Sequence, residues 1–166
     1  MVKIKSLTIL LLVLMGGIGC FLYLFPSEEK KIKKQFALLS QWASKDQEEN
    51  VFSLAQRGKS IGTLFGENSG LKVPPYSIDG RYTREEIMSY AVRARSQFSR
   101  LNLEFYDLNI SFPEEGLAKV TLTGKLTGKL QDKENVNEIR ELECVLKKME
   151  GKWLFSEFEV VEVLKK

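Results

Sequence analysis

The sequence contains no histidine, and this absence narrows the chemistry that the chain can perform. Histidine is the commonest general base, the commonest metal ligand and the usual pH switch near neutrality. No cluster of cysteines or carboxylates has the spacing of a zinc or calcium site either. The sequence therefore predicts no metal ion and no cofactor, and it disfavours catalysis.

Cysteine is also scarce, with only Cys20 and Cys144. Cys20 lies in an apolar N-terminal segment and Cys144 in a predicted strand, so the two are not expected to form a disulfide. Cys144 alternates with Leu142 and Leu146, which indicates a small buried core residue. The missing disulfide neither supports nor excludes an extracytoplasmic location.

The chain has no strong excess of charge of one sign. It carries 25 basic and 22 acidic residues, and two of the basic ones, Lys3 and Lys5, precede the apolar segment. The rest of the chain is therefore nearly neutral. Because a nucleic-acid-binding protein normally shows a clear basic excess or stripe, that class is disfavoured.

Residues 1–26 are predicted to be an N-terminal transmembrane anchor. From Leu7 to Phe25 the chain holds 19 residues without a charge, and a helix of that length spans roughly 28 Å, close to the thickness of the hydrocarbon core. Two alternatives stay open: a cleaved signal peptide, and a lipoprotein processed at Cys20. The anchor makes the lipid bilayer the first expected partner.

The orientation of this single-pass protein follows from the lysines on either side of the anchor. Lys3 and Lys5 favour a cytoplasmic N-terminus, whereas four lysines just beyond the anchor oppose it: Lys30, Lys31, Lys33 and Lys34. A short N-terminal tail followed by a folded domain favours export of the domain. We therefore expect residues 27–166 to be periplasmic or extracytoplasmic.

Residues 27–166 are predicted to form one α+β domain that begins with three helices. The first follows a cap at Ser27, the second covers about Gln47 to Phe65, and the third begins at Thr83 with a capping box to Glu86. Five arginines surround the third helix and are interpreted as salt-bridged surface: Arg81, Arg84, Arg93, Arg95 and Arg100. The alternative is that Arg93 and Arg100, which share a face, receive an acidic partner.

Strand patterns dominate the rest of the domain. A break at 66–70 precedes a short extended stretch, 71–78, and four long strands are predicted at 101–112, 117–130, 137–149 and 153–164. Between Ala118 and Leu126 apolar and polar residues alternate, so one face of the sheet is expected to carry the helices and the other to face water.

This order of elements, together with Gly151-Lys152-Trp153-Leu154-Phe155 and the closing Val160-Val161-Glu162-Val163, resembles the nuclear transport factor 2-like superfamily, and in particular its membrane-anchored bacterial envelope members. The resemblance implies a cone, in which a curved antiparallel sheet wraps around helices and leaves a pocket at its open end. It also implies a homodimer through the sheet face. The fold hosts isomerases, dehydratases, binding modules and assembly subunits, so it does not decide the function.

Enzymes that this sequence resembles commonly place an Asp, Tyr or His inside the cone. The candidates for catalysis are Asp79, Asp107 and Tyr76, and those for the ligand pocket are Tyr90 and Phe105. Each also has a structural explanation, because Asp79 precedes a glycine in a predicted turn and Tyr90 lies on the buried stripe of the third helix.

The preferred hypothesis is a membrane-anchored, non-catalytic domain that binds a partner protein or a small apolar ligand, or that serves in an assembly. The alternative is a small isomerase- or dehydratase-type enzyme that uses a pocket aspartate and a tyrosine. The geometry of the pocket distinguishes them. An enzyme needs a carboxylate that points into the cone, whereas a cone filled by Leu, Phe and Val contradicts catalysis.

Overall fold

The computed structural model describes residues 27–46, 49–132 and 134–161. The chain divides into two compact units, Met1–Lys31 and Ile32–Lys166; the fold is that of the second unit, and of the first unit the structure describes residues 27–31. The predicted anchor, with Leu7 and Phe25, lies outside the described residues. Among the residues that are described, no helix is both long and apolar enough to span a membrane.

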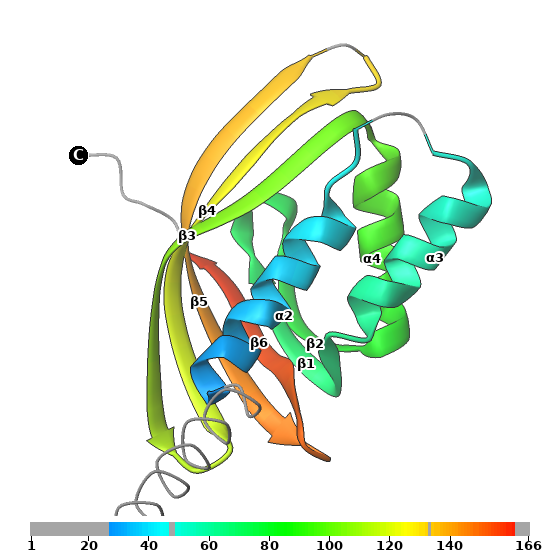
Figure 1. Ribbon diagram of the computed structural model, residues 1–166. Coiled ribbons are helices and arrows are strands. Elements are labelled where there is room, and N and C mark those ends of the chain that lie inside the picture. Colours follow the sequence, from blue (N-terminus) through cyan, green and yellow to red (C-terminus); the bar gives the residue numbers. More distant parts are fainter. Residues whose placement is uncertain (1–26, 47–48, 133, 162–166) are drawn as a thin grey trace, which may run out of the picture. The chain divides into compact units, whose positions relative to one another are not determined.

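The described elements confirm an α+β fold with three helices on a six-stranded sheet (Figure 1). In chain order they are α2 (Glu28–Ala43), α3 (Val51–Gly62), β1 (Phe65–Val73), the 3₁₀ turn η1 (Pro74–Tyr76), β2 (Ile78–Thr83), α4 (Arg84–Ser96), β3 (Phe98–Glu114), β4 (Leu117–Leu130), β5 (Asn135–Met149) and β6 (Lys152–Val161).

The sheet has the order β2-β1-β6-β5-β4-β3. The four long strands β3 to β6 form the predicted antiparallel meander, and β1 joins it by pairing parallel to β6. β1 and β2 form a hairpin around Pro74 and Pro75. Residues 66–70 belong to β1, so the predicted break there is wrong. Within β1, residues 68–73 pair with β2 and residues 70–72 also pair with β6, with a register shift between Phe65 and Gly70; pairing of this kind overrides weak local propensity.

Local capping explains where the helices begin. α3 begins later than predicted, because the side chain of Asn50 accepts a hydrogen bond from the backbone N–H of Ser53 at 2.8 Å. α4 begins as predicted, with reciprocal hydrogen bonds between Thr83 and Glu86 that make a capping box.

The core lies on the concave side of the curved sheet, which α2 crosses with α3 and α4 beside it (Figure 1). The ring of Phe36 on α2 makes edge-to-face contacts with Phe105, at 5.5 Å between centroids, and with Phe155, at 5.0 Å. Inward-facing residues of β4 and β5 complete this core: Ala118, Val120, Leu122, Leu142, Cys144 and Leu146. The predicted burial of Cys144 is therefore confirmed, and apolar side chains fill the interior.

Candidate functional site

The three candidates for catalysis lie at the surface and do not meet. Asp79 on β2 and Asp107 on β3 are exposed, and Tyr76 in η1 is 61% exposed. Asp107 has a φ of 55°, at a bulge where the register between β3 and β4 shifts. It lines a shallow depression on the outer face of the sheet with Thr121 and Thr123.

The interior of the described domain holds no buried carboxylate. Besides apolar residues, the described buried residues with polar or charged side chains are Lys45, Ser69, Arg95 and Ser156. General acid–base chemistry on an apolar substrate needs a titratable group within hydrogen-bond reach of the reacting proton. The interior of the described part of the cone does not provide such a carboxylate.

The two predicted pocket residues lie in different places. Tyr90 on α4 is 36% exposed and packs edge-to-face against Tyr82, at 5.3 Å between ring centroids. Phe105 is half-buried and lines a groove between α2 and β3 with a volume of about 500 Å³. We call this the α2–β3 groove; it is lined by Lys33, Phe36, Ala37, Ser40, Glu104, Phe105, Tyr106 and Leu108.

The α2–β3 groove exists because β3 is an edge strand that α2 covers only in part. At the start of β3, Lys45 exchanges two backbone hydrogen bonds with Leu101, at 2.7 and 2.9 Å. Two residues further, Ser40 Oγ donates to the carbonyl of Leu103 at 2.5 Å, and Leu103 N–H donates to Ser44 Oγ at 2.9 Å. These four hydrogen bonds satisfy the backbone N–H and C=O groups of Leu101 and Leu103, which point to the outer edge of β3.

Beyond that point the edge of β3 is open. In an antiparallel ladder every second residue points its N–H and C=O to the same edge, so Phe105 presents its backbone as Leu101 and Leu103 do. Among the described residues, none forms a hydrogen bond with the Phe105 backbone on this side. The groove therefore combines an apolar floor, formed by Phe36, Phe105 and Leu108, with an unpaired backbone donor and acceptor.

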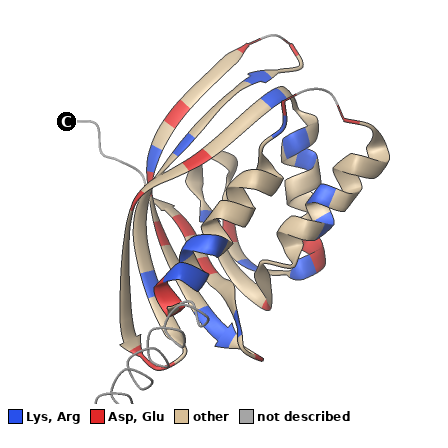
Figure 2. Ribbon diagram, viewed as in Figure 1, with Lys and Arg blue, Asp and Glu red and all other residues tan. Residues whose placement is uncertain are grey.

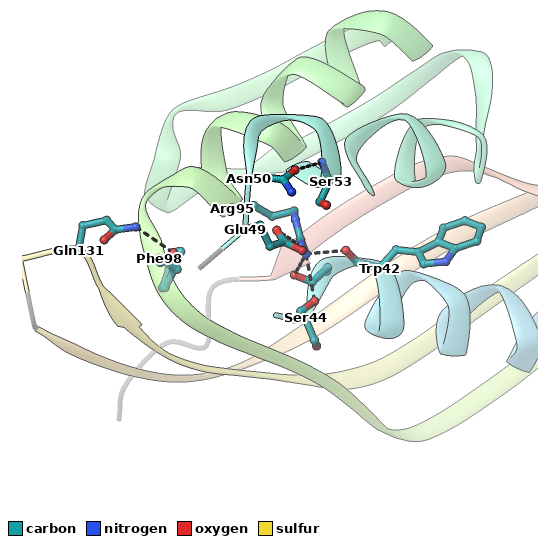
Figure 3. A network of polar contacts seen from close by, with 9 residues as sticks. Trp42, Ser44, Glu49, Asn50, Ser53, Arg95, Phe98 and Gln131 are labelled. Carbon is teal, nitrogen blue, oxygen red and sulfur yellow. Dashed lines mark hydrogen bonds and ion pairs between the residues drawn. The ribbon is translucent and has the colours of Figure 1, made fainter. Parts of the chain in front are cut away.

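A buried arginine binds the C-terminal end of α2 and the segment that follows it (Figure 3). Arg95 on α4 is 2% exposed. Its guanidinium donates to the backbone carbonyls of Trp42, Ala43 and Ser44, and it forms an ion pair with Glu49 at 2.5 Å. The last carbonyls of a helix have no partner within the helix, so Arg95 satisfies the C-terminal end of α2. We call this arrangement the Arg95 clamp.

The prediction that Arg95 lies on the surface is wrong. A signal was present in the sequence, because Arg95 lies four residues after Ala91 and eight after Ile87, on the stripe of α4 that faces the core. Glu49, whose side chain is 15% exposed, was not identified as a site residue. It lines an open polar cleft between α2 and α3 with a volume of about 1170 Å³, with one of its oxygens bound by Arg95.

Comparison with solved structures identifies the fold. One neighbour, a proposed scytalone dehydratase from Novosphingobium aromaticivorans, has a TM-score of 0.63 and 16% identity over 82% of this chain and 85% of its own. A hexachlorocyclohexane dehydrochlorinase (LinA, type 2) has a TM-score of 0.65 and 10% identity over 80% and 83%. A proposed calcium/calmodulin-dependent protein kinase II association domain from Xanthomonas campestris has a TM-score of 0.59 and 14% identity over 80% and 82%.

These neighbours have nuclear transport factor 2-like cone folds, so they support the resemblance to that superfamily and the α+β fold class. No protein-family model and no curated protein matches the sequence. At such identities the similarity establishes the fold, and function has to be argued from the site.

Proposed function

We propose that residues 27–166 form a non-catalytic binding domain whose site is the α2–β3 groove. The observation that carries this proposal is the composition of the groove: a volume of about 500 Å³ with two phenylalanines and a leucine on its floor and polar groups on its rim. Ligand sites commonly have about 300–1,000 Å³ and are mostly apolar with a few polar groups that fix orientation. A small, mainly apolar ligand with one hydrogen-bonding group fits this description.

The position of the carboxylates supports binding over catalysis. Asp79 and Asp107 are exposed, and neither of them lines the groove. Glu104 is the carboxylate that lines the groove, and it lies opposite Lys125 in the β3–β4 ladder. Two hydroxyls line the groove: that of Ser40 donates to the carbonyl of Leu103, and that of Tyr106 is hydrogen-bonded to Glu104, which raises the pKa of Tyr106.

A second candidate function is the dehydratase- or isomerase-type enzyme, and the comparisons favour it. Two of the structural neighbours bear the names of a dehydratase and a dehydrochlorinase. In this chain the less exposed carboxylate is Glu49, whose side chain is 15% exposed in the α2–α3 cleft, rather than Asp79 or Asp107. A test of binding therefore also needs a readout for catalysis.

Binding is tested by screening a library of small apolar fragments against the full-length chain in detergent micelles, with ¹H–¹⁵N correlation spectra as the readout. We expect fragments to shift the amide resonances of Phe36 and Phe105. Ala37→Trp fills the groove, because Ala37 is exposed and lines it, and should weaken binding at least tenfold. Ala55→Trp is the matched control, since Ala55 is also an exposed helical alanine but does not line the groove.

Two results would contradict the binding proposal. In the first, fragments shift resonances elsewhere, or Ala37→Trp binds them as well as Ala55→Trp does. In the second, mass spectrometry finds that bound compounds are converted to products lighter by one water or one hydrogen halide, and Glu49→Gln abolishes the conversion. The second result would establish the enzyme.

We also propose that residues 1–26 anchor the domain in a membrane with the domain on the periplasmic or extracytoplasmic side. Reporters that are active on only one side of the membrane, fused after Lys166, test this orientation. A signal from the cytoplasmic reporter would mean that the lysines after the anchor determine the topology.

The proposed homodimer through the outer face of the sheet stays a prediction. That face carries mostly polar side chains in its centre, such as Lys119, Thr121 and Glu143, so a dimer there would have a polar interface. Light scattering on the detergent-solubilised chain measures the mass directly, and a monomer at high concentration would contradict the dimer.

A further inference from the structure

A second pocket lies near the start of β3 and shares no residue with the α2–β3 groove. It has a volume of about 380 Å³, and its lining brings together basic side chains from three separate parts of the chain. Arg100 comes from β3, Lys129 from β4 and Lys45 from the segment after α2. We call it the basic pocket. Figure 2 shows blue segments, which mark Lys and Arg, in these three parts of the chain at the same end of the sheet.

The positions of Arg100 and Lys129 do not stabilise the sheet. They are directly opposite each other in the β3–β4 ladder, and like charges in opposite positions destabilise a sheet. Four residues further along the same strands, Glu104 is opposite Lys125, which is the favourable arrangement. Among the described residues no carboxylate forms an ion pair with Arg100 or Lys129.

The neighbours of the two cations are hydrogen-bond donors. Lys129 is opposite Asn135 on its other side, and Asn102 is opposite Thr127 two rows further along the ladder, on the same face of the sheet. All of these residues line the basic pocket. Amides, a hydroxyl, an ammonium and a guanidinium therefore meet on three adjacent strands, which is a set of donors that an oxyanion can accept from.

Lys45 closes the pocket from the side. Its backbone exchanges two hydrogen bonds with Leu101, which fixes it next to Arg100, and its side chain is 8% exposed. One carboxylate, Asp46, also lines the pocket, so the lining holds three basic groups and one acidic group.

We infer that the basic pocket binds a phosphate group. A phosphate supplies the negative charge that Arg100 and Lys129 lack, and the planar guanidinium of arginine matches the geometry of phosphate oxygens. The volume leaves room for a small molecule that carries the phosphate. The source of the phosphate is either a soluble phosphate compound or the headgroup of an anionic phospholipid.

The test is calorimetric titration of inorganic phosphate into the full-length chain in nonionic detergent, at constant ionic strength. We expect binding to the wild-type chain and a loss of affinity of about tenfold or more in Arg100→Gln, which removes a charged donor. Lys125→Gln is the matched control, because Lys125 lies on the same strand as Lys129 but opposite a glutamate. It should bind phosphate as the wild type does.

A second arm distinguishes the two sources. The chain is reconstituted into nanodiscs of phosphatidylcholine or of phosphatidylglycerol, and the titration is repeated. Weaker phosphate binding in phosphatidylglycerol than in phosphatidylcholine supports a headgroup in the pocket, and equal binding supports a soluble phosphate compound. No binding to the wild-type chain in any medium, or the same affinity in Arg100→Gln and Lys125→Gln, would overturn the inference. Neither result bears on the α2–β3 groove.

Discussion

Replacing Arg95 by methionine should destabilise the domain more than any substitution of an exposed arginine. Methionine preserves most of the length and apolar packing of the side chain but removes the guanidinium. The carboxylate of Glu49, 15% exposed, then loses its partner, and the carbonyls of Trp42, Ala43 and Ser44 lose their donor.

The expected cost follows from what remains behind. Removing one partner of a buried ion pair typically costs about 3–5 kcal/mol, because the other charge stays buried without compensation. A domain of this size has a free energy of unfolding of about 5–15 kcal/mol. We therefore expect Arg95→Met to lose about 3–5 kcal/mol, a large part of the total, and its Tm to fall by roughly 10 °C or more.

Urea denaturation followed by tryptophan fluorescence measures this cost, since Trp42 lies beside the clamp and Trp153 is buried in the core. Arg93→Met on the exposed face of the same helix is the control and should stay within about 0.5 kcal/mol of wild type. In the double variant Arg95→Met/Glu49→Gln the uncompensated charge is gone, so part of the stability should return.

A free energy of unfolding for Arg95→Met within about 1 kcal/mol of the wild-type value, the range of an ordinary substitution, would contradict a stabilising role for the Arg95 clamp. A double variant no more stable than Arg95→Met would show that the carbonyls of α2, rather than Glu49, account for the loss.

Three further predictions concern single positions. Burial raises the pKa of the Cys144 thiol, so this residue should react with iodoacetamide far more slowly in the native chain than in urea, as peptide mapping will show; equal rates would contradict its burial. Hydrogen bonds from the Thr83 backbone and hydroxyl lower the pKa of Glu86. They therefore stabilise the folded chain above the ordinary glutamate pKa, and this stabilisation is lost as the pH falls through the lowered value. Thr83→Ala should raise the midpoint of the Glu86 titration measured by NMR. Gly58→Ala places a Cβ in steric conflict with Cγ2 of Val92. The overpacking should cost about 1–3 kcal/mol in thermal unfolding and outweigh the roughly 0.5–1 kcal/mol that alanine gains in a helix; a raised Tm would refute this.

Much of the architecture could be predicted because it depends on local patterns. The alternation from Ala118 to Leu126 places the apolar residues of β4 on the inner face, as observed. The capping box at Thr83 sets the start of α4, and the turn at Gly151 permits the β5–β6 hairpin. Each of these features involves residues that are close in the sequence.

The features that could not be predicted depend on contacts between distant segments. β1 is extended because β2 and β6 pair with it, although its own residues do not favour a strand. Asp107 lies at a bulge, which the strand pattern does not reveal. Arg95 is buried because the end of α2, more than 50 residues away, provides the acceptors for its guanidinium.

The sequence by itself determined the fold class, the inner face of the sheet and the burial of Cys144, because periodicity and capping act within one element. Only the tertiary structure decided where the candidate sites lie. The α2–β3 groove and the basic pocket both depend on how far α2 and the segment after it cover the outer edge of β3. That coverage is fixed by hydrogen bonds that join Ser40, Ser44 and Lys45 to a strand some 60 residues later, and no local pattern encodes it.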